Sequence, residues 1–107
     1  MITELITLSV VIPVYNEETR IGKTLEKISL YLETCKYTYE IIAVNDGSCD
    51  KTSDIIKGFA NRYEKVRLIE SRKNQGKGFS VRKGMLASSG QYVLFSGADL
   101  STPTEEI

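Results

Sequence analysis

The sequence has 107 residues, a length that suits a single domain with a modest core. Its fourteen basic residues balance fourteen acidic residues, so no net charge would attract the whole chain to nucleic acid or to an anionic membrane. The sequence contains no histidine, which excludes histidine-based catalysis and metal binding within this chain, and no apolar run reaches the roughly 18 residues that span a bilayer.

Short apolar runs alternate along the chain with amphipathic stretches. Residues 8–14 are nearly all apolar and β-branched, which predicts a strand that is buried on both faces. Apolar residues then recur at helical spacing over 21–32, which predicts an amphipathic helix. The same reasoning predicts further strands over 41–44, 66–69 and 92–95, and further helices over 55–63 and 79–89. Gly84 weakens the prediction of the last helix.

The predicted order is β-α-β-α-β-α-β. Strands that are separated by helices run parallel, with right-handed crossovers that place the helices over the sheet. We therefore expect an α/β fold, a Rossmann-like half of a doubly wound sheet with four mostly parallel strands and three helices. Sheets of this kind bind ligands beyond the carboxyl ends of their strands.

The last residues predict one more helix. Thr102, Pro103 and Glu105 suit the N-cap, first helical and capping-box positions. The sequence stops two residues after Glu105, at Ile107, so we expect a chain that has been truncated.

Polar loops follow the predicted strands at 13–17, 45–48, 74–78 and 96–101. Because the carboxyl ends of parallel strands meet at one edge, Glu17, Asp46 and Asp99 are expected to converge there. Gathered carboxylates repel one another, so a bound cation or ligand donors would stabilise them. Taken alone, each carboxylate is better explained by a structural role, such as helix entry for Glu17 or turn formation for Asp46. Three at matching strand ends favour a binding site.

The glycine-containing loop at 74–78 fits neither of two well-known phosphate loops. The turn after the first strand has no glycine, which argues against a dinucleotide fingerprint, and Gly78 stands where a Walker loop needs Ser or Thr. Gly76 and Gly78 either let the backbone approach a diphosphate at the start of the third helix or simply form a turn. The basic residues from 72 to 83 are either a solvated face or a patch near a phosphate.

Four segments together resemble family-2 glycosyltransferases. They read V-I-P-V-Y-N-E at 11–17, E-I-I-A-V-N-D-G-S at 40–48, N-Q-G-K-G at 74–78 and V-R-K-G-M-L-A at 81–87. The resemblance extends from about residue 8 to the end of the chain, and it is closest to the branch that makes dolichyl- or polyprenyl-phosphate glucose and mannose. It implies that residues 1–107 form the N-terminal, nucleotide-sugar-binding part of a GT-A catalytic domain.

The resemblance also implies an activity and a set of partners. The activity is transfer of a sugar from a UDP- or GDP-sugar, with Mg²⁺ or Mn²⁺ as cofactor and a polyprenyl or dolichyl phosphate as a candidate acceptor. A cytoplasmic location is expected, peripheral at the membrane in the full-length protein. A non-catalytic nucleotide-sugar-binding module and a generic α/β interaction domain remain alternatives. The strand at 92–95 is expected at a sheet edge, where it would support a homo-oligomer.

The site residues carried over from the family are Pro13, Tyr15, Glu17, Val44, Asp46, Ala98 and Asp99. The first three would contact the nucleotide, the next two would hold the base and its ribose, and the last two would lie at the diphosphate, with Asp99 as a metal ligand. Two positions depart from the family. Gly97 stands where the usual Asp-Ala-Asp begins, and Asn45 replaces a frequent acidic residue. The resemblance identifies no catalytic base in this chain.

Overall fold

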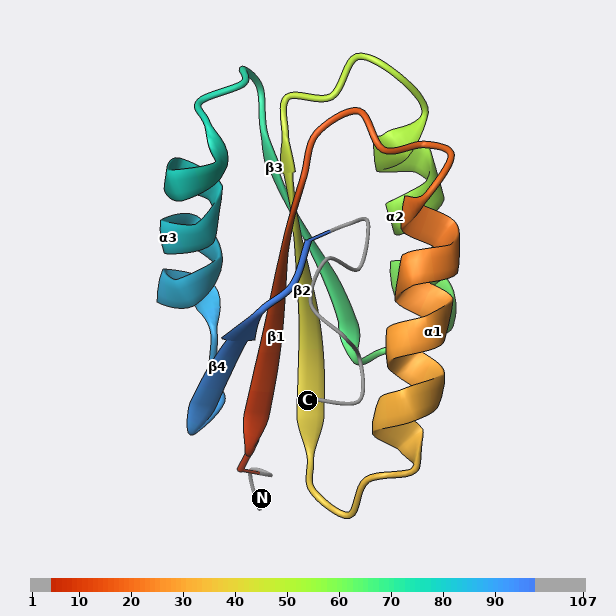
Figure 1. Ribbon diagram of the computed structural model, residues 1–107, viewed down its shortest axis with the longest axis vertical. Helices are drawn as coiled ribbons and strands as arrows, with labels where there is room; N and C mark the ends of the chain where they lie inside the picture. The colour runs from red at the N-terminus through yellow and green to blue at the C-terminus, as the bar shows by residue number, and fades with distance from the viewer. Residues whose placement is uncertain (1–4, 98–107) are drawn as a thin grey trace.

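The computed structural model describes residues 5–97 (Figure 1). Within this range the elements are β1 (Leu8–Val14), α1 (Ile21–Glu33), β2 (Tyr39–Asp46), α2 (Thr52–Arg62), β3 (Val66–Ser71), α3 (Lys77–Ala87) and β4 (Tyr92–Phe95). Their order confirms the predicted alternation of strands and helices. The clearest difference is at β2, which is longer than expected and ends at Asp46. Asp46 is therefore a strand residue, where the sequence predicted a turn. The expected helix start at Thr102 and the chain end at Ile107 lie outside the described residues.

The described strands form one sheet in the order β3-β2-β1-β4. All three neighbouring pairs are parallel, which confirms the expected α/β arrangement. Val14 pairs with Asn45 and Asp46 pairs with Ser71, so β1, β2 and β3 finish side by side at the same end of the sheet. Strand β4 pairs with β1 and lies at the outer edge of the described sheet; the edge position is the one that the sequence predicted.

Helices α1 and α2 cover one face of the sheet and α3 covers the other (Figure 1). Because successive strand side chains point to opposite faces, Val10 and Ile12 pack under α1 and α2, whereas Val11 packs under α3. All three side chains are fully buried. The continuous apolar run in β1 therefore reflects a strand that is covered on both faces, as predicted.

Helix α3 lies unusually near the sheet at Gly84. A β-carbon at this position would lie 2.3 Å from Cγ1 of Val11 and 3.1 Å from Cγ2 of Val44. The helix buries only Ser80 and Gly84, two small residues one turn apart. Gly84 weakened the sequence prediction of this helix, yet it is the residue that allows the helix to dock.

A buried carboxylate joins the strands at the end of the sheet opposite the carboxyl ends. Glu40 accepts hydrogen bonds from the hydroxyl of Ser9 at 2.6 Å, the amide of Ser89 at 2.7 Å and the guanidinium of Arg67 at 3.0 Å. Burial raises the pKa of Glu40, but these hydrogen bonds outweigh burial and hold the pKa below its ordinary value. The Glu40 network thus fixes the segment that leads into β4.

No helix between residues 5 and 97 is long and apolar enough to cross a bilayer. Cys35 and Cys49 are both free thiols.

Candidate functional site

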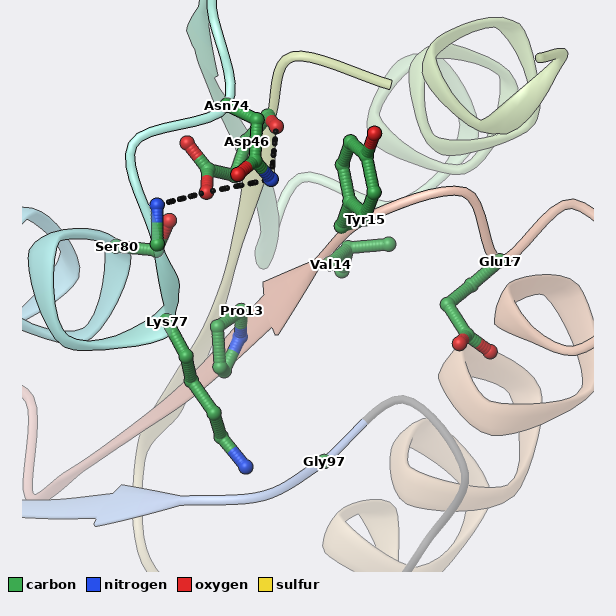
Figure 2. A pocket seen from close by; sticks show the side chains of 10 residues that line it. Pro13, Val14, Tyr15, Glu17, Asp46, Asn74, Lys77, Ser80 and Gly97 are labelled. Carbon is green, nitrogen blue, oxygen red and sulfur yellow. Dashed lines mark hydrogen bonds between the residues drawn. The ribbon is translucent and has the colours of Figure 1, made fainter. Parts of the chain in front are cut away.

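A pocket of about 400 Å³ opens at the carboxyl ends of the strands (Figure 2). We call it the rim pocket, and its lining residues are Pro13, Val14, Tyr15, Glu17, Asp46, Asn74, Gly76, Lys77, Ser80 and Gly97. They come from the end of β1 and the loop after it, the end of β2, the loop before α3, the first turn of α3 and the segment after β4. The volume falls within the usual range for small-molecule sites. Residues from each of the four predicted loops therefore meet at one rim, the last loop being represented by Gly97, where the described residues end.

The structure brings together four of the seven residues carried over from the family: Pro13, Tyr15, Glu17 and Asp46. Val44 does not line the pocket, because its side chain is fully buried under α3 beside Gly84. Ala98 and Asp99 lie outside the described residues. The chain that leads to them passes the pocket at Gly97.

The loop after β1 is held by the loop after β2. Asn16 has a φ of 51°, a left-handed conformation that asparagine tolerates better than most residues. Its amide donates to Oγ of Ser48 at 2.9 Å, and its Oδ1 accepts from the amide of Cys49 at 2.8 Å. The next amide, from Glu17, donates to Oγ1 of Thr52 at 2.9 Å. These bonds fix the backbone at Asn16 and Glu17, directly after Tyr15.

Glu17 has a structural role at the start of α1. Its carbonyl accepts the Ile21 amide at 2.8 Å, and its Oε2 lies 3.2 Å from Nε of Arg20. A carboxylate at a helix N-terminus is also favoured by the helix dipole. The side chain remains 22% exposed and lines the rim pocket. Helix entry, one of the two explanations open from the sequence, is therefore part of its role.

Asp46 is nearly buried, and its carboxylate organises the loop before α3 (Figure 2). Its Oδ1 accepts the Gln75 amide at 2.9 Å, and its Oδ2 accepts the Gly76 amide at 2.8 Å and Nδ2 of Asn74 at 3.2 Å. The amides of residues 75 and 76 therefore bind Asp46. The sequence left open whether the backbone at Gly76 approaches a diphosphate. In the structure the Gly76 N–H donates to Asp46 and so is not available to a ligand.

Gly47 lets this loop approach the end of β2. Its φ is 71°, and a β-carbon there would lie 2.5 Å from the backbone nitrogen of Asn74 and 2.5 Å from the backbone carbon of Lys73. Any side chain would collide with main-chain atoms that have no room to move. The wall of the rim pocket at 74–76 thus depends on both Asp46 and Gly47.

The first turn of α3 supplies two further polar side chains. The Lys77 side chain extends past Pro13 toward Gly97 (Figure 2). Ser80 is fully buried, and its hydroxyl has no hydrogen-bond partner among residues 5–97. Sequence reasoning treated Lys77 only as one of several basic residues and missed Ser80. The signal that could have found Ser80 is its spacing of four from Gly84, which marks the sheet-facing side of the helix.

The basic residues from 72 to 83 divide between two roles. Nζ of Lys83 donates to the Glu70 carbonyl at 3.2 Å and to Oγ of Ser71 at 3.0 Å, so this lysine ties α3 to β3. Of this group, Lys77 alone is among the described residues that line the rim pocket.

The described residues do not by themselves form a metal site. No group of three or more Asp, Glu, Cys or His side chains with suitable placement occurs between residues 5 and 97. Of the two pocket carboxylates, Asp46 is hydrogen-bonded to the loop before α3 and Glu17 is ion-paired with Arg20, while Gly97 offers no side-chain ligand. Asp99, the expected ligand, lies outside this range.

Comparison with known proteins gives a consistent family. The model of glycosyl transferase family 2 matches residues 9–107. A dolichyl-phosphate beta-glucosyltransferase from Drosophila melanogaster is 43% identical over 102 residues, covering 89% of this chain and 31% of that protein. The Mus musculus protein of the same name is 40% identical over 107 residues, covering 94% of this chain and 33% of that protein. The chain thus spans about a third of the length of these relatives.

Several solved structures share the fold. S. aureus TarS 1-349 in complex with UDP-GlcNAc has a TM-score of 0.74 and 26% identity, over 88% of this chain and 27% of that one. Glucosyl-3-phosphoglycerate synthase from Mycobacterium tuberculosis, in complex with Mn²⁺, UDP and glucosyl-3-phosphoglycerate, has a TM-score of 0.69 and 26% identity, over 86% and 33%. The mannosyltransferase PcManGT from Pyrobaculum calidifontis, in complex with GDP-Man and Mn²⁺, has a TM-score of 0.75 and 22% identity, over 91% and 28%.

Proposed function

This chain belongs to glycosyltransferase family 2, and we propose that its rim pocket binds the nucleoside diphosphate of a UDP- or GDP-sugar. The observation that carries the proposal is the meeting of Pro13, Tyr15, Glu17 and Asp46 around one pocket at the carboxyl ends of the strands. These residues come from two separate family motifs, and the fold places them together as a nucleotide site requires. The UDP-GlcNAc complex of TarS and the UDP complex of glucosyl-3-phosphoglycerate synthase support the choice of ligand.

Three of the pocket residues have distinct proposed roles toward the nucleotide. The Tyr15 ring is 46% exposed, so it offers a flat apolar surface beside the base. Glu17 is partly exposed beside it and can accept hydrogen bonds from ribose hydroxyls. Asp46 acts mainly by holding the wall at residues 74–76. These roles require a fixed backbone, which the bonds between the loops after β1 and β2 supply.

A divalent cation, Mg²⁺ or Mn²⁺, is part of the proposal. Asp99 would hold it together with oxygens of the donor phosphates, because hard cations prefer oxygen ligands. When bound, the cation would neutralise charge that develops on the leaving nucleoside diphosphate. The Mn²⁺ in the glucosyl-3-phosphoglycerate synthase complex supports this choice. Since Gly97 provides no carboxylate, the donor phosphates would have to supply more of the ligands.

For the whole protein we propose sugar transfer to a dolichyl or polyprenyl phosphate. Support comes from the dolichyl-phosphate beta-glucosyltransferases, which are about 40% identical over most of this chain. The alternative is that this polypeptide alone is a non-catalytic nucleotide-sugar-binding module. Gly97 favours the alternative, whereas the strand-end motifs favour the enzyme.

We also propose that the chain self-associates through β4. This strand is at the sheet edge, and its Tyr92 and Phe95 side chains are 64% and 36% exposed. An edge strand with free backbone groups and apolar side chains is a template for pairing. The expected contribution of Leu100 to this surface lies outside the described residues.

Calorimetric titration with UDP and with GDP in the presence of Mn²⁺ tests the ligand proposal. One of the two should bind with saturable heat, and Tyr15→Ala should weaken that binding. Leu30→Ala, which removes an exposed apolar side chain on α1 outside the pocket, should not. If neither nucleotide binds, the proposed function is wrong. Incubation of the chain with labelled UDP- or GDP-sugar and dolichyl phosphate then separates the enzyme from the binding module, because only the enzyme forms lipid-linked sugar.

A further inference from the structure

The first turn of α3, residues 77–80, has features that the strand-end motifs do not explain. We propose that this turn binds the diphosphate of the donor through the Lys77 ammonium and the Ser80 hydroxyl. The inference rests on the proposed function and deepens it. It assigns a phosphate contact to the helix, separate from the metal ligand expected at Asp99.

The charges in the rim pocket favour an anion beside Lys77. Both oxygens of Asp46 accept hydrogen bonds from the loop before α3, and Glu17 lies against Arg20. The Lys77 ammonium has no ion pair or hydrogen bond with any residue between 5 and 97, although the side chain lines the same pocket. An unpaired ammonium in a pocket complements a phosphate, and lysine is a common phosphate ligand. Lys77 is therefore the described pocket cation that is available to a ligand.

Ser80 gives a second and independent indication. Its side chain is fully buried, it lines the rim pocket, and its Oγ has no partner among the described residues. Leaving a buried hydroxyl unpaired is unfavourable, so most buried polar atoms in proteins are hydrogen-bonded. A ligand oxygen at this wall would supply the missing partner. Ser80 is one helical turn after Lys77, so the two side chains share a side of the helix.

The backbone of the same turn is also suited to an anion. The Ser80 amide donates to the Gly76 carbonyl at 3.2 Å and so starts the hydrogen-bond ladder of α3. The amides of residues 77–79 precede it and have no acceptor within the helix. The amides of residues 75 and 76 are bound to Asp46, so those of the first turn are the ones left for a ligand. The positive end of the helix dipole adds to the effect of Lys77.

Gly97 gives the proposal a consequence for metal dependence. The Lys77 side chain extends toward Gly97, where the family usually has a carboxylate (Figure 2). A lysine contacts phosphate directly and needs no cation between them. The chain should therefore retain measurable affinity for the diphosphate after EDTA has removed divalent metal.

The test is calorimetric titration of UDP, GDP, uridine and guanosine in EDTA. Lys77→Gln should weaken the binding of whichever diphosphate the wild-type chain prefers by about tenfold, the size expected for loss of one charged hydrogen bond. It should leave the matching nucleoside unchanged and reduce the dependence of diphosphate affinity on salt. The matched control is Lys73→Gln, which removes the same charge from the neighbouring loop outside the pocket lining and should change affinity less than twofold.

Ser80→Ala separates a ligand contact from a structural role. If Ser80 binds the diphosphate, this variant should weaken diphosphate binding severalfold while the melting temperature of the unliganded protein stays the same or rises, because an unpaired buried hydroxyl is removed. A lower melting temperature with unchanged affinity would show a structural role and overturn the assignment of Ser80.

Two outcomes distinguish the inference from the function on which it rests. If the wild-type chain binds UDP or GDP and Lys77→Gln binds it equally well, the inference is wrong and the proposed function stands. If the wild-type chain binds neither nucleotide with or without Mn²⁺, the proposed function is wrong and the inference fails with it.

Discussion

At the scale of single residues, Asp46 shows how a site carboxylate can act through its neighbours. Asp46→Ala removes the acceptor for two backbone amides and for the Asn74 side chain, so the wall at 74–76 should loosen. We expect UDP or GDP affinity to fall by about 1–3 kcal/mol, the range for hydrogen bonds to a charged group. Calorimetry measures the affinity, and amide exchange at Gln75 and Gly76 reports the loop. Unchanged affinity together with protected amides would remove Asp46 from the site.

Gly97 permits a second test at this scale. Mn²⁺ should bind weakly to the wild-type chain alone and more tightly when UDP or GDP is present, because donor phosphates supply oxygen ligands. Gly97→Asp should increase Mn²⁺ affinity by adding a carboxylate next to the rim pocket. Titration of the paramagnetic metal, followed by line broadening, gives both affinities. Equal Mn²⁺ affinity with and without nucleotide would contradict this account.

Glu40 makes a prediction about stability and pH. Its pKa is lowered in the folded protein, so the stability it contributes is present above the unfolded pKa and is lost as pH falls through the folded pKa. Glu40→Gln should cost about 1.5–3 kcal/mol at neutral pH, because the amide replaces a charged acceptor for Ser9, Ser89 and Arg67. Urea unfolding from neutral pH to about pH 3 should show a shallower acid loss in the variant than in the wild type. Parallel curves would show that Glu40 does not carry this effect.

The site residues predicted from the sequence were those at strand ends. Parallel strands bring their carboxyl ends to one edge whatever the loops do, so Tyr15, Glu17 and Asp46 could be placed together in advance. Val44 could not be placed by motif alone, because it lies two residues before the end of β2, under α3. Ser80 was missed because its burial depends on how closely α3 approaches the sheet. That distance is a tertiary property, and the sequence pattern does not predict it.

At the scale of elements, α3 depends on Gly84. Gly84→Ala improves helix propensity, but the added methyl would overlap Cγ1 of Val11. Valine is branched at Cβ and this side chain is fully buried, so the methyl cannot rotate out of the way. We expect a net destabilisation of about 1–3 kcal/mol, as for other overpacked cores. Gly58→Ala in α2 is the matched control, since a β-carbon there meets nothing within 4 Å. That variant should gain about 0.5–1 kcal/mol from propensity alone.

Urea unfolding of the two glycine variants measures both effects in one experiment. Equal gains in the free energy of unfolding at the two positions would mean that α3 can shift away from the sheet without cost. Element boundaries show the same dependence on context. Strand β1 matched its prediction because its apolar run is continuous, whereas β2 runs on to Asp46 because the polar Asn45 and Asp46 still pair with β3.

At the scale of the whole molecule, the position of β4 at the edge of the sheet formed by residues 5–97 predicts self-association. We expect a dimer or larger assembly at micromolar concentration, held by edge pairing or by exchange of terminal segments. Tyr92→Lys should shift the equilibrium toward monomer. Leu30→Lys on α1 is the matched control, because both side chains are 64% exposed in the described structure. Sedimentation velocity measures the species present. A wild-type monomer with rapid amide exchange along β4 would show that the chain tolerates its open edge.

The central claim is that the rim pocket binds a nucleoside diphosphate, and mapping amide chemical shifts during titration with UDP or GDP tests it most directly. The account predicts saturable shifts at Tyr15, Glu17, Gly76 and Lys77, which line the rim pocket. It predicts none at Tyr63 and Lys65, which line a separate hollow of about 300 Å³ between the ends of α1 and α2. Shifts confined to that second hollow, or no shifts with either nucleotide, would contradict the claim.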